Sequence, residues 1–179
     1  MDAYIYLQGM SADSMLTLLS APSLPADLAT AVDEQLWDDR EGLWLDLPIV
    51  GGGPSTAAPT LDGVFGALVT ADPDRADRVL TQLLDPERFG SSYGLRYLPH
   101  EHPAYDANEY WRGPAWPQLN YMAHVAARRW DRVDVADAIR TQSLRGAKRS
   151  AFAEYWNADT GAGRGARPQG WAALAATFV

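Results

Sequence analysis

Hydrophobic residues recur at helical spacing along most of the chain, between shorter stretches rich in glycine, proline and aspartate. The pattern predicts the following helices: one helix or a broken pair over 2–20, then Pro25 to about Trp37, Leu61–Val69, Pro73–Leu84, Pro114 to about Trp130, Val133 to about Lys148, and a last one from Trp171. With few strands and with long loops at alternate junctions, the sequence predicts an all-α fold built as an array of helical hairpins.

Two of these helices have clear start signals. Pro25 suits the first helical position, and Leu28, Val32 and Leu36 then repeat every four residues on one face. Asp72 is a predicted N-cap. The residues after it form the apolar stripe of a helix that is buried on one side: Ala76, Val79, Leu80, Leu83 and Leu84.

Three stretches between the helices have other patterns. Residues 43–47 predict a short strand or hairpin arm, because leucines alternate with other side chains: Leu43, Leu45 and Leu47 against Trp44 and Asp46. Residues 48–59 are small residues, glycines and prolines, which predict a loop at the rim of the domain. Residues 85–113 have no sustained period, and a structured loop of that length is usually functional.

Composition excludes several classes of protein. The 179 residues, 47% of them hydrophobic, fit one folded domain. A net charge of −8 and a pI near 4.7 argue against nucleic acid or an anionic membrane as the partner. The lack of cysteine favours a reducing compartment, so we expect a cytoplasmic protein. No signal peptide or membrane-spanning stretch is visible in the sequence.

Aromatic residues are unusually frequent in the predicted loops. They include Trp44, Tyr93, Tyr97, Tyr105, Tyr110, Trp111, Tyr155 and Trp156. Rings beside charged residues suit a sugar, whose C–H faces stack on rings while its hydroxyl groups bond to polar side chains. The alternative is that the rings only close the end of the helical array.

A second informative stretch is FAEYWNADTGAGRGARPQGW, residues 152–171. Glu154 lies between Phe152 and Tyr155, an apolar setting that suits proton transfer. The glycines that follow allow the backbone to approach a ligand closely. A structural ion pair is the alternative role for Glu154, and spacing alone does not separate the two.

Two motifs together identify a family. YGLRYLPHEHPAYDANEYWRGPAWPQLNY, followed downstream by FAEYWNADTGAGRGA, resembles glycoside hydrolase family 63, and DAYIYLQ and LWDDREGLWLDL extend the resemblance over nearly the whole chain. The family has an (α/α)6 barrel and includes bacterial mannosylglycerate and glucosylglycerate hydrolases. The resemblance therefore implies a hydrolase of a small α-glucoside or α-mannoside such as glucosylglycerate, acting with inversion.

The resemblance also assigns roles to individual residues. Glu154 takes the place of the general base that activates water, while Tyr110, Trp111 and Trp116 match positions that shape the sugar pocket. Gln169 falls where related hydrolases place a ligand-contacting glutamine. Arg112 is expected either to bind an anionic or hydroxyl-rich part of the substrate or to brace its loop.

The sequence does not contain the motif of the family's general acid. The family's acid is an aspartate upstream of the matched part, and a six-hairpin barrel needs on the order of 350 residues at ordinary element lengths. Residues 1–179 are therefore expected to form the C-terminal half of the catalytic domain, about half of the toroid, which would need the missing N-terminal half or self-association to cover its inner apolar faces. Asp62, Asp106 and Glu109 are the candidate substitutes, although capping or turn roles are the more common use of such residues.

Neither a metal nor a cofactor is expected. His100 and His102 flank Glu101, but the chain has only three histidines and no cysteine to complete a site. Three hypotheses follow: a glycosidase fragment with Glu154 as base, a carbohydrate-binding half-toroid without catalysis, and a helical scaffold that binds protein.

Overall fold

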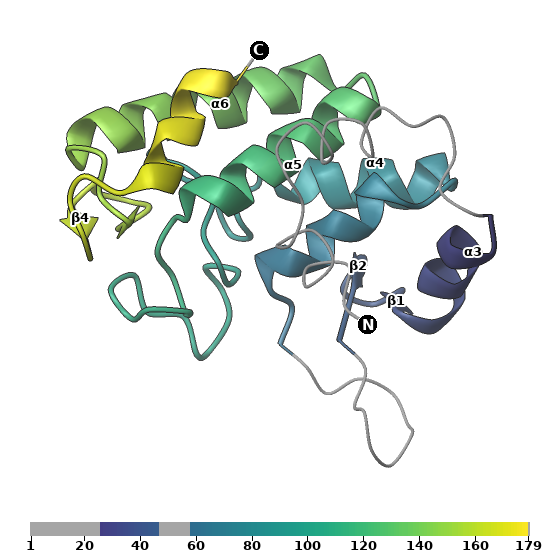
Figure 1. Cartoon of the computed structure of the whole chain (residues 1–179). Helices are drawn as coiled ribbons and strands as arrows, with labels where there is room; N and C mark the ends of the chain where they lie inside the picture. The colour runs from purple at the N-terminus through teal and green to yellow at the C-terminus, as the bar shows by residue number, and fades with distance from the viewer. Residues whose placement is uncertain (1–25, 47–57, 179) are drawn as a thin grey trace.

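The computed structural model describes residues 26–46 and 58–178. The helix predicted over 2–20 and most of the loop predicted over 48–59 lie outside these residues. Helices form most of the regular structure (Figure 1). In chain order the elements are α3 (Ala26–Gln35), β1 (Trp37–Asp38), β2 (Leu43–Trp44), the 3-10 helix η1 (Leu61–Leu68), α4 (Pro73–Gln82), α5 (Pro117–Arg129), α6 (Val133–Arg149), β3 (Tyr155–Trp156), β4 (Gly163–Arg164) and the 3-10 helix η2 (Gly170–Thr177).

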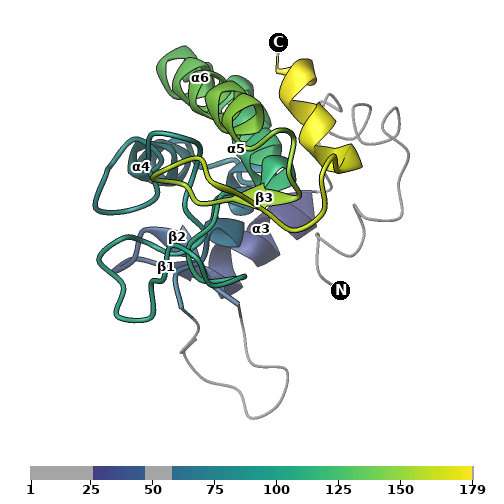
Figure 2. The same ribbon diagram turned by 90° about the vertical axis from the view of Figure 1, so that its left-hand side faces the viewer.

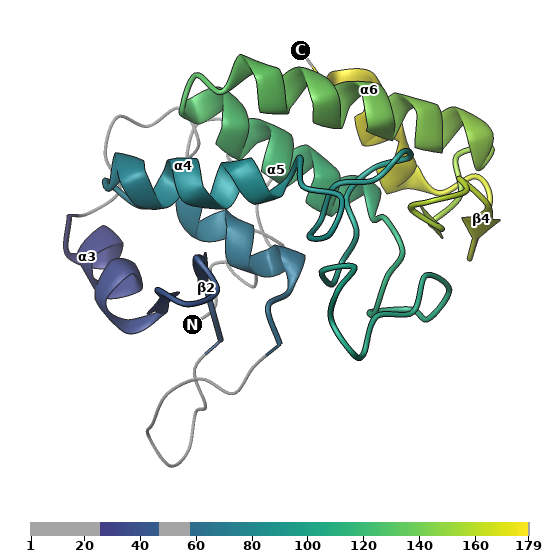
Figure 3. The same cartoon turned by 180° about the vertical axis from the view of Figure 1, so that it is seen from behind.

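The helices α5 and α6 form an antiparallel hairpin, in which α5 runs through the middle of the molecule and α6 lies along its upper edge (Figures 1 and 3). Alanines of both helices, such as Ala123 and Ala136, are fully buried. His124 is also buried and bridges the pair, with its Nδ1 3.0 Å from the carbonyl oxygen of Ala136. Helices η1 and η2 pack on α5, and η2 also packs on α6 (Figure 2).

Several predicted elements are confirmed. The helices α3, α4 and α6 agree with the predicted segments to within a few residues. Asp72 caps α4, because its carboxylate accepts hydrogen bonds from the amides of Asp74 and Arg75 at 2.9 and 3.2 Å. Two leucines of the predicted stripes, Leu28 and Leu84, are exposed, so each apolar face is narrower than the spacing suggested.

The hairpin β1–β2 does not alternate between buried and exposed residues. Leu43, Trp44 and Leu45 are all buried. The reason is that η1 packs closely on this hairpin. A Cβ atom at Gly63 would lie 2.5 Å from the carbonyl oxygen of Trp44, and one at Gly66 would overlap the indole of Trp44. The absence of side chains at these two positions lets Trp44 turn into the core.

The helix predicted from Pro114 begins three residues later, at Pro117. Ala115 forms an isolated antiparallel bridge with Trp156, with backbone hydrogen bonds of 2.8 and 3.1 Å. Trp116 is extended, with φ −112° and ψ 121°, as expected of a residue that precedes proline. The bridge therefore delays the helix and joins two distant parts of the chain.

The long loop between α4 and α5 contains no helix or strand apart from that bridge, in agreement with the prediction. Its anchor is Arg96, which is buried. The Nε atom of Arg96 donates to Asp159 at 3.1 Å, and its Nη1 atom donates to the carbonyls of Pro86, at 2.9 Å, and Gly90. The hydroxyl of Tyr105 donates to the other oxygen of Asp159 at 2.8 Å. These contacts tie the loop to the turn between β3 and β4.

None of the helices among the described residues combines the length and the apolar character that a membrane-spanning segment needs.

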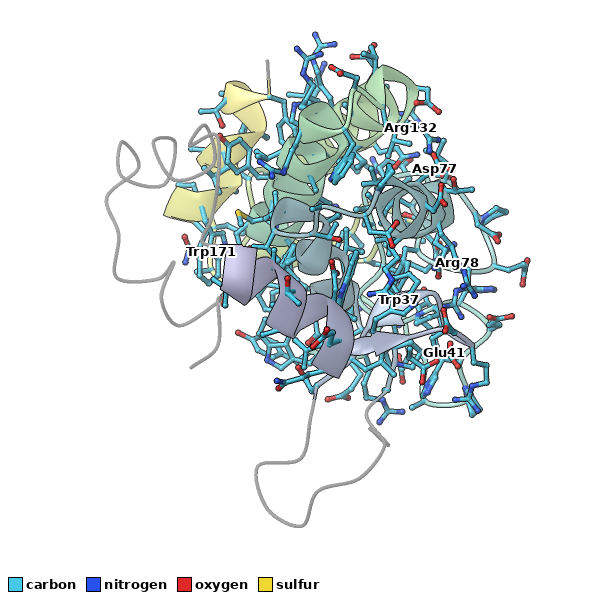
Figure 4. All side chains as sticks on the ribbon, turned by 90° about the vertical axis from the view of Figure 1, so that its right-hand side faces the viewer. Trp37, Glu41, Asp77, Arg78, Arg132 and Trp171 are labelled. Atoms are coloured by element: carbon cyan, nitrogen blue, oxygen red, sulfur yellow. The ribbon has the colours of Figure 1, made fainter. Side chains whose placement is uncertain are left out.

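Replacing Asp159 by Ala leaves the buried guanidinium of Arg96 without its charge partner. We expect a loss of about 2–3 kcal/mol in the free energy of unfolding, less than for a fully buried pair because Asp159 is 35% exposed. Asp77→Ala is the matched control, since Asp77 pairs with Arg132 at the outer surface (Figure 4) and should cost less than about 1 kcal/mol. Urea unfolding measures both, and equal losses would contradict the anchoring role of Arg96.

The phenol of Tyr105 makes the stability of the fold depend on pH. Burial, followed by the hydrogen bond to Asp159, raises the pKa of Tyr105 from 10.0 to about 12. The folded chain therefore holds this proton more tightly than the unfolded chain, and the resulting stability is full below pH 10 and lost as the pH rises through about 12. We expect Tyr105→Phe to lose less stability than the parent over this interval, as measured by urea unfolding at a series of pH values.

Candidate active site

The bridge between Ala115 and Trp156 brings the two sequence motifs together. Tyr110, Trp111 and Arg112 lie in the loop just before it, and Trp116 is the N-cap of α5. On the other side of the bridge, Glu154 immediately precedes β3, and Gln169 is the N-cap of η2. The predicted residues thus come from two segments that meet at one end of the α5–α6 hairpin (Figure 1).

Three aromatic rings form a stack. Trp116 lies nearly parallel to Trp111, with centroids 4.2 Å apart, and nearly parallel to Tyr155, at 4.6 Å. One face of an indole has no room for two rings at these distances, so Trp111 and Tyr155 cover its opposite faces. Tyr110 stands edge-on to all three rings, at 4.7 Å from Trp116, 5.0 Å from Tyr155 and 5.4 Å from Trp111.

The members of this stack differ in exposure. Trp116 is 1% exposed, whereas Trp111 is 43% and Tyr110 is 41% exposed. Trp116 therefore presents no ring face to solvent and serves as the support on which Trp111 rests. Large exposed rings are costly in water, so Trp111 and Tyr110 mark a surface suited to a ligand with apolar faces.

Glu154 is held at both carboxylate oxygens. The hydroxyl of Tyr110 donates to Oε1 at 3.1 Å, and the backbone amide of Ala166 donates to Oε2 at 3.1 Å. The indole of Trp171 donates to the backbone carbonyl of Glu154 at 2.8 Å. Within the described residues no cation lies within ion-pair distance of Glu154, so the ion-pair alternative has no support there. Partial burial, and then this hydrogen bond and the nearby carboxylate charge, raise the pKa of Tyr110.

A glycine in the β4 region makes this arrangement possible. Gly165 has φ +68°, in the left-handed region that favours glycine. A Cβ atom at Gly165 would lie 2.8 Å from the Cβ atom of Glu154 and would overlap its Oε2. The close approach lets the amide of Ala166 reach the carboxylate.

Gln169 and Arg112 make local contacts. The side-chain oxygen of Gln169 accepts from the amide of Trp171 at 3.1 Å and so caps η2. The Nε atom of Arg112 donates to the carbonyl of Ala104 at 2.8 Å, and its side chain is exposed. The loop-bracing contact, one of the two roles predicted for Arg112, is thus present in the structure.

The three other acids considered from the sequence have separate settings. Asp106 accepts from the amide of Asn108 at 2.9 Å in a turn, and Glu109 is exposed in the same loop. Asp62 lies in the first turn of η1 and accepts from the hydroxyl of Tyr97 at 2.6 Å. Among residues 26–46 and 58–178, no three His, Asp or Glu side chains are grouped to hold a metal ion.

Sequence reasoning did not assign three residues that build the site. Tyr155 forms one face of the ring stack, Trp171 bonds to the backbone of Glu154, and Tyr97 contacts the ring of Trp111 at 5.0 Å. The sequence marks Tyr97 and Tyr155 only as loop aromatics. The high frequency of aromatic residues in these motifs indicates that rings matter here. It does not indicate which rings meet, because the contacts join residues far apart in the sequence.

We expect Gly165→Ala to lose about 1–2 kcal/mol of stability from its left-handed backbone alone, and also to push the carboxylate of Glu154 aside. The pKa of Tyr110 should then fall toward its ordinary value, which NMR of ring-labelled tyrosine measures. Gly170→Ala is the control, because a Cβ atom there meets nothing within 4 Å. An unchanged Tyr110 pKa in Gly165→Ala would show that Gly165 does not set the position of Glu154.

Comparison with known proteins shows the family of this chain. Residues 22–172 match the model of the mannosylglycerate hydrolase MGH1-like glycoside hydrolase domain. The chain is 31% identical to the mannosylglycerate hydrolase of Thermus thermophilus over 147 residues, covering 81% of this chain and 35% of that protein. It is 34% identical to the glucosylglycerate hydrolase of Mycolicibacterium hassiacum over 108 residues, covering 58% of this chain and 24% of that protein.

Solved structures show the same likeness. The crystal structure of a family 63 mannosylglycerate hydrolase from Thermus thermophilus, in complex with glucose, matches with a TM-score of 0.72 and 29% sequence identity. The match covers 81% of this chain and 34% of that one. The mostly helical fold with short hairpins is therefore that of family 63 structures. The chain spans about a third of the length of the mannosylglycerate hydrolases that it matches.

Proposed function

Because this chain belongs to the mannosylglycerate hydrolase MGH1-like family of glycoside hydrolases, as its motifs led us to expect, we propose that it carries one half of an inverting glycosidase active site. The substrate is a small α-glucoside or α-mannoside such as glucosylglycerate. Glu154 is the general base, and the acid comes from another part of the catalytic domain. The observation that carries the proposal is the carboxylate of Glu154, fixed beside exposed rings.

The setting of Glu154 supports the role of base. A general base must point at a water molecule from a fixed position. The hydrogen bonds from Tyr110 and Ala166 orient both carboxylate oxygens, and each oxygen has further acceptor capacity for a water molecule. We propose that a sugar stacked against Trp111 turns its anomeric carbon toward this carboxylate. Attack by that water on the face opposite the leaving group inverts the configuration.

The exposed side chains around Glu154 supply binding. Trp111 and Tyr110 offer the sugar a ring face and a ring edge, with Trp116 as the buried support beneath Trp111. Gln169 and Arg112 lie on the two segments that flank these rings and provide polar groups for hydroxyl groups or for a carboxylate on the substrate.

A second carboxyl group is needed on the opposite face of the sugar, roughly 6.5–9.5 Å from the base. Asp62 and Asp106 are already engaged with Tyr97 and a turn, so of the three candidate acids only Glu109, which is exposed, has no such contact. We propose a source for the acid outside the described residues. We therefore propose that residues 1–179 form the C-terminal half of an (α/α)6 barrel. Its partner is the N-terminal half or, failing that, a second copy of the chain. The cytoplasmic location stays a prediction.

The test uses the chain extended upstream to the length of its relatives. We expect Glu154→Gln to lower kcat for glucose release from glucosylglycerate by about 10²–10⁴-fold with a small change in KM, because general base catalysis contributes that much. Glu34→Gln, an exposed acid on α3, is the matched control. Proton NMR of the first-formed glucose anomer tests inversion. Retained configuration, or full activity in Glu154→Gln, would contradict the proposal.

The same assay on the 179-residue chain tests the origin of the acid. Hydrolysis by this chain, lost in Glu154→Gln, would place the acid within these residues and contradict the half-barrel. Glucose binding without hydrolysis in both lengths would favour the second candidate, a carbohydrate-binding domain, which the exposed rings Trp111 and Tyr110 also support.

A further inference from the structure

We propose that Tyr97 and Asp62 are positioning residues, whose mutual hydrogen bond fixes the ring of Trp111 as the sugar platform. This inference rests on the proposed function for its consequence in binding. The two residues come from different segments: Tyr97 lies in the loop before α5, and Asp62 lies in η1.

Trp111 needs support that its own segment does not supply. It lies in a loop without helix or strand, and 43% of its surface is exposed. One face rests on Trp116, and one edge meets Tyr110. Stacking on one ring still allows an indole to slide and turn in its own plane. A further contact against another part of the ring is required to fix its orientation.

Tyr97 makes that contact. Its ring centroid lies 5.0 Å from that of Trp111, with the planes tilted by 56°. The hydroxyl of Tyr97 in turn donates to Oδ2 of Asp62 at 2.6 Å. A tyrosine that is held at both ends, by its backbone and by its hydroxyl, has one ring orientation. Because the indole of Trp111 packs against this fixed ring, its orientation is restricted as well.

The backbone of Tyr97 is equally fixed. Its carbonyl accepts from the amide of Leu61 at 2.8 Å, and its amide donates to the carbonyl of Gly113 at 3.4 Å. Asp62 follows Leu61 at the start of η1, so helix and loop meet at Tyr97 through both side chain and main chain. Burial, and then the nearby charge of Asp62, raise the pKa of Tyr97, so the phenol keeps its proton as the donor at physiological pH.

Three variants separate this role from a general loss of stability. Tyr97→Phe keeps the ring and removes the hydroxyl donor. Asp62→Ala removes the acceptor, whereas Asp62→Asn keeps an acceptor oxygen at the same place and should restore the parent behaviour. Tyr121→Phe is the matched control, since the ring of Tyr121 contacts Phe178, away from the stack.

The first readout does not depend on activity. In the extended chain labelled with 5-fluorotryptophan, the fluorine signal of Trp111, assigned by Trp111→Phe, reports the order of its ring. We expect this signal to shift or broaden in Tyr97→Phe and Asp62→Ala, and to keep its parent form in Asp62→Asn and Tyr121→Phe. The signal of Trp37, whose ring lies against the guanidinium of Arg75, should stay unchanged in all four. An unchanged Trp111 signal in Tyr97→Phe would overturn the proposal, whether or not the protein hydrolyses glycosides.

The second readout is the effect on substrate. We expect Tyr97→Phe and Asp62→Ala to raise KM for glucosylglycerate about three- to tenfold with kcat within about twofold, because an unfixed platform must be ordered on binding. In a Trp111→Ala background the same changes should have no further effect on KM. If the effects instead add, or if KM stays unchanged while the Trp111 signal broadens, Tyr97 and Asp62 do not act through Trp111 on the substrate. A parent enzyme without hydrolysis contradicts the proposed function alone.

Discussion

The buried guanidinium of Arg96 is the constraint on which the site depends. A cation removed from water must be surrounded by acceptors, and Arg96 finds them in its own loop and in the carboxylate of Asp159. If the loop before α5 and the turn after β3 separated, the buried guanidinium of Arg96 would lose its charge partner. The two segments are therefore held together. Their fixed relation allows Ala115 to bridge Trp156, and that bridge places Tyr110 within reach of Glu154.

Buried and exposed aromatic rings have different roles in the site. Trp116 and Trp156 are almost fully buried and set the spacing of the two segments, while Trp111 and Tyr110 remain open to a ligand. The backbone contributes as much as the side chains, since the amide of Ala166 holds one oxygen of Glu154. In the proposed site, this carboxylate is held by a phenol and an amide, and by no cation among the described residues, so lone pairs of both oxygens remain to accept from a ligand or a water molecule.

The sequence predicts well what depends on neighbouring residues. The apolar stripe and the Asp72 cap located α4, and the spacing of apolar residues located α6, because helix signals act within one or two turns. The start of α5 was missed because the bridge to Trp156 lies 41 residues away from Ala115, beyond any local pattern. The rings were found by their frequency and family motif. The stack of Trp116 with Tyr155, by contrast, is a tertiary contact that periodicity does not encode.

The single bridge between Ala115 and Trp156 has a consequence for the evolution of this chain. Side chains along an extended segment alternate in direction, so the register of the bridge decides on which side Glu154 and Trp116 project. Substitutions near the bridge leave this register intact. Insertion of one residue between Ala115 and Trp116, or between Glu154 and Trp156, would turn Trp116 or Glu154, respectively, to the other side of its segment. These two short segments are therefore expected to keep their length.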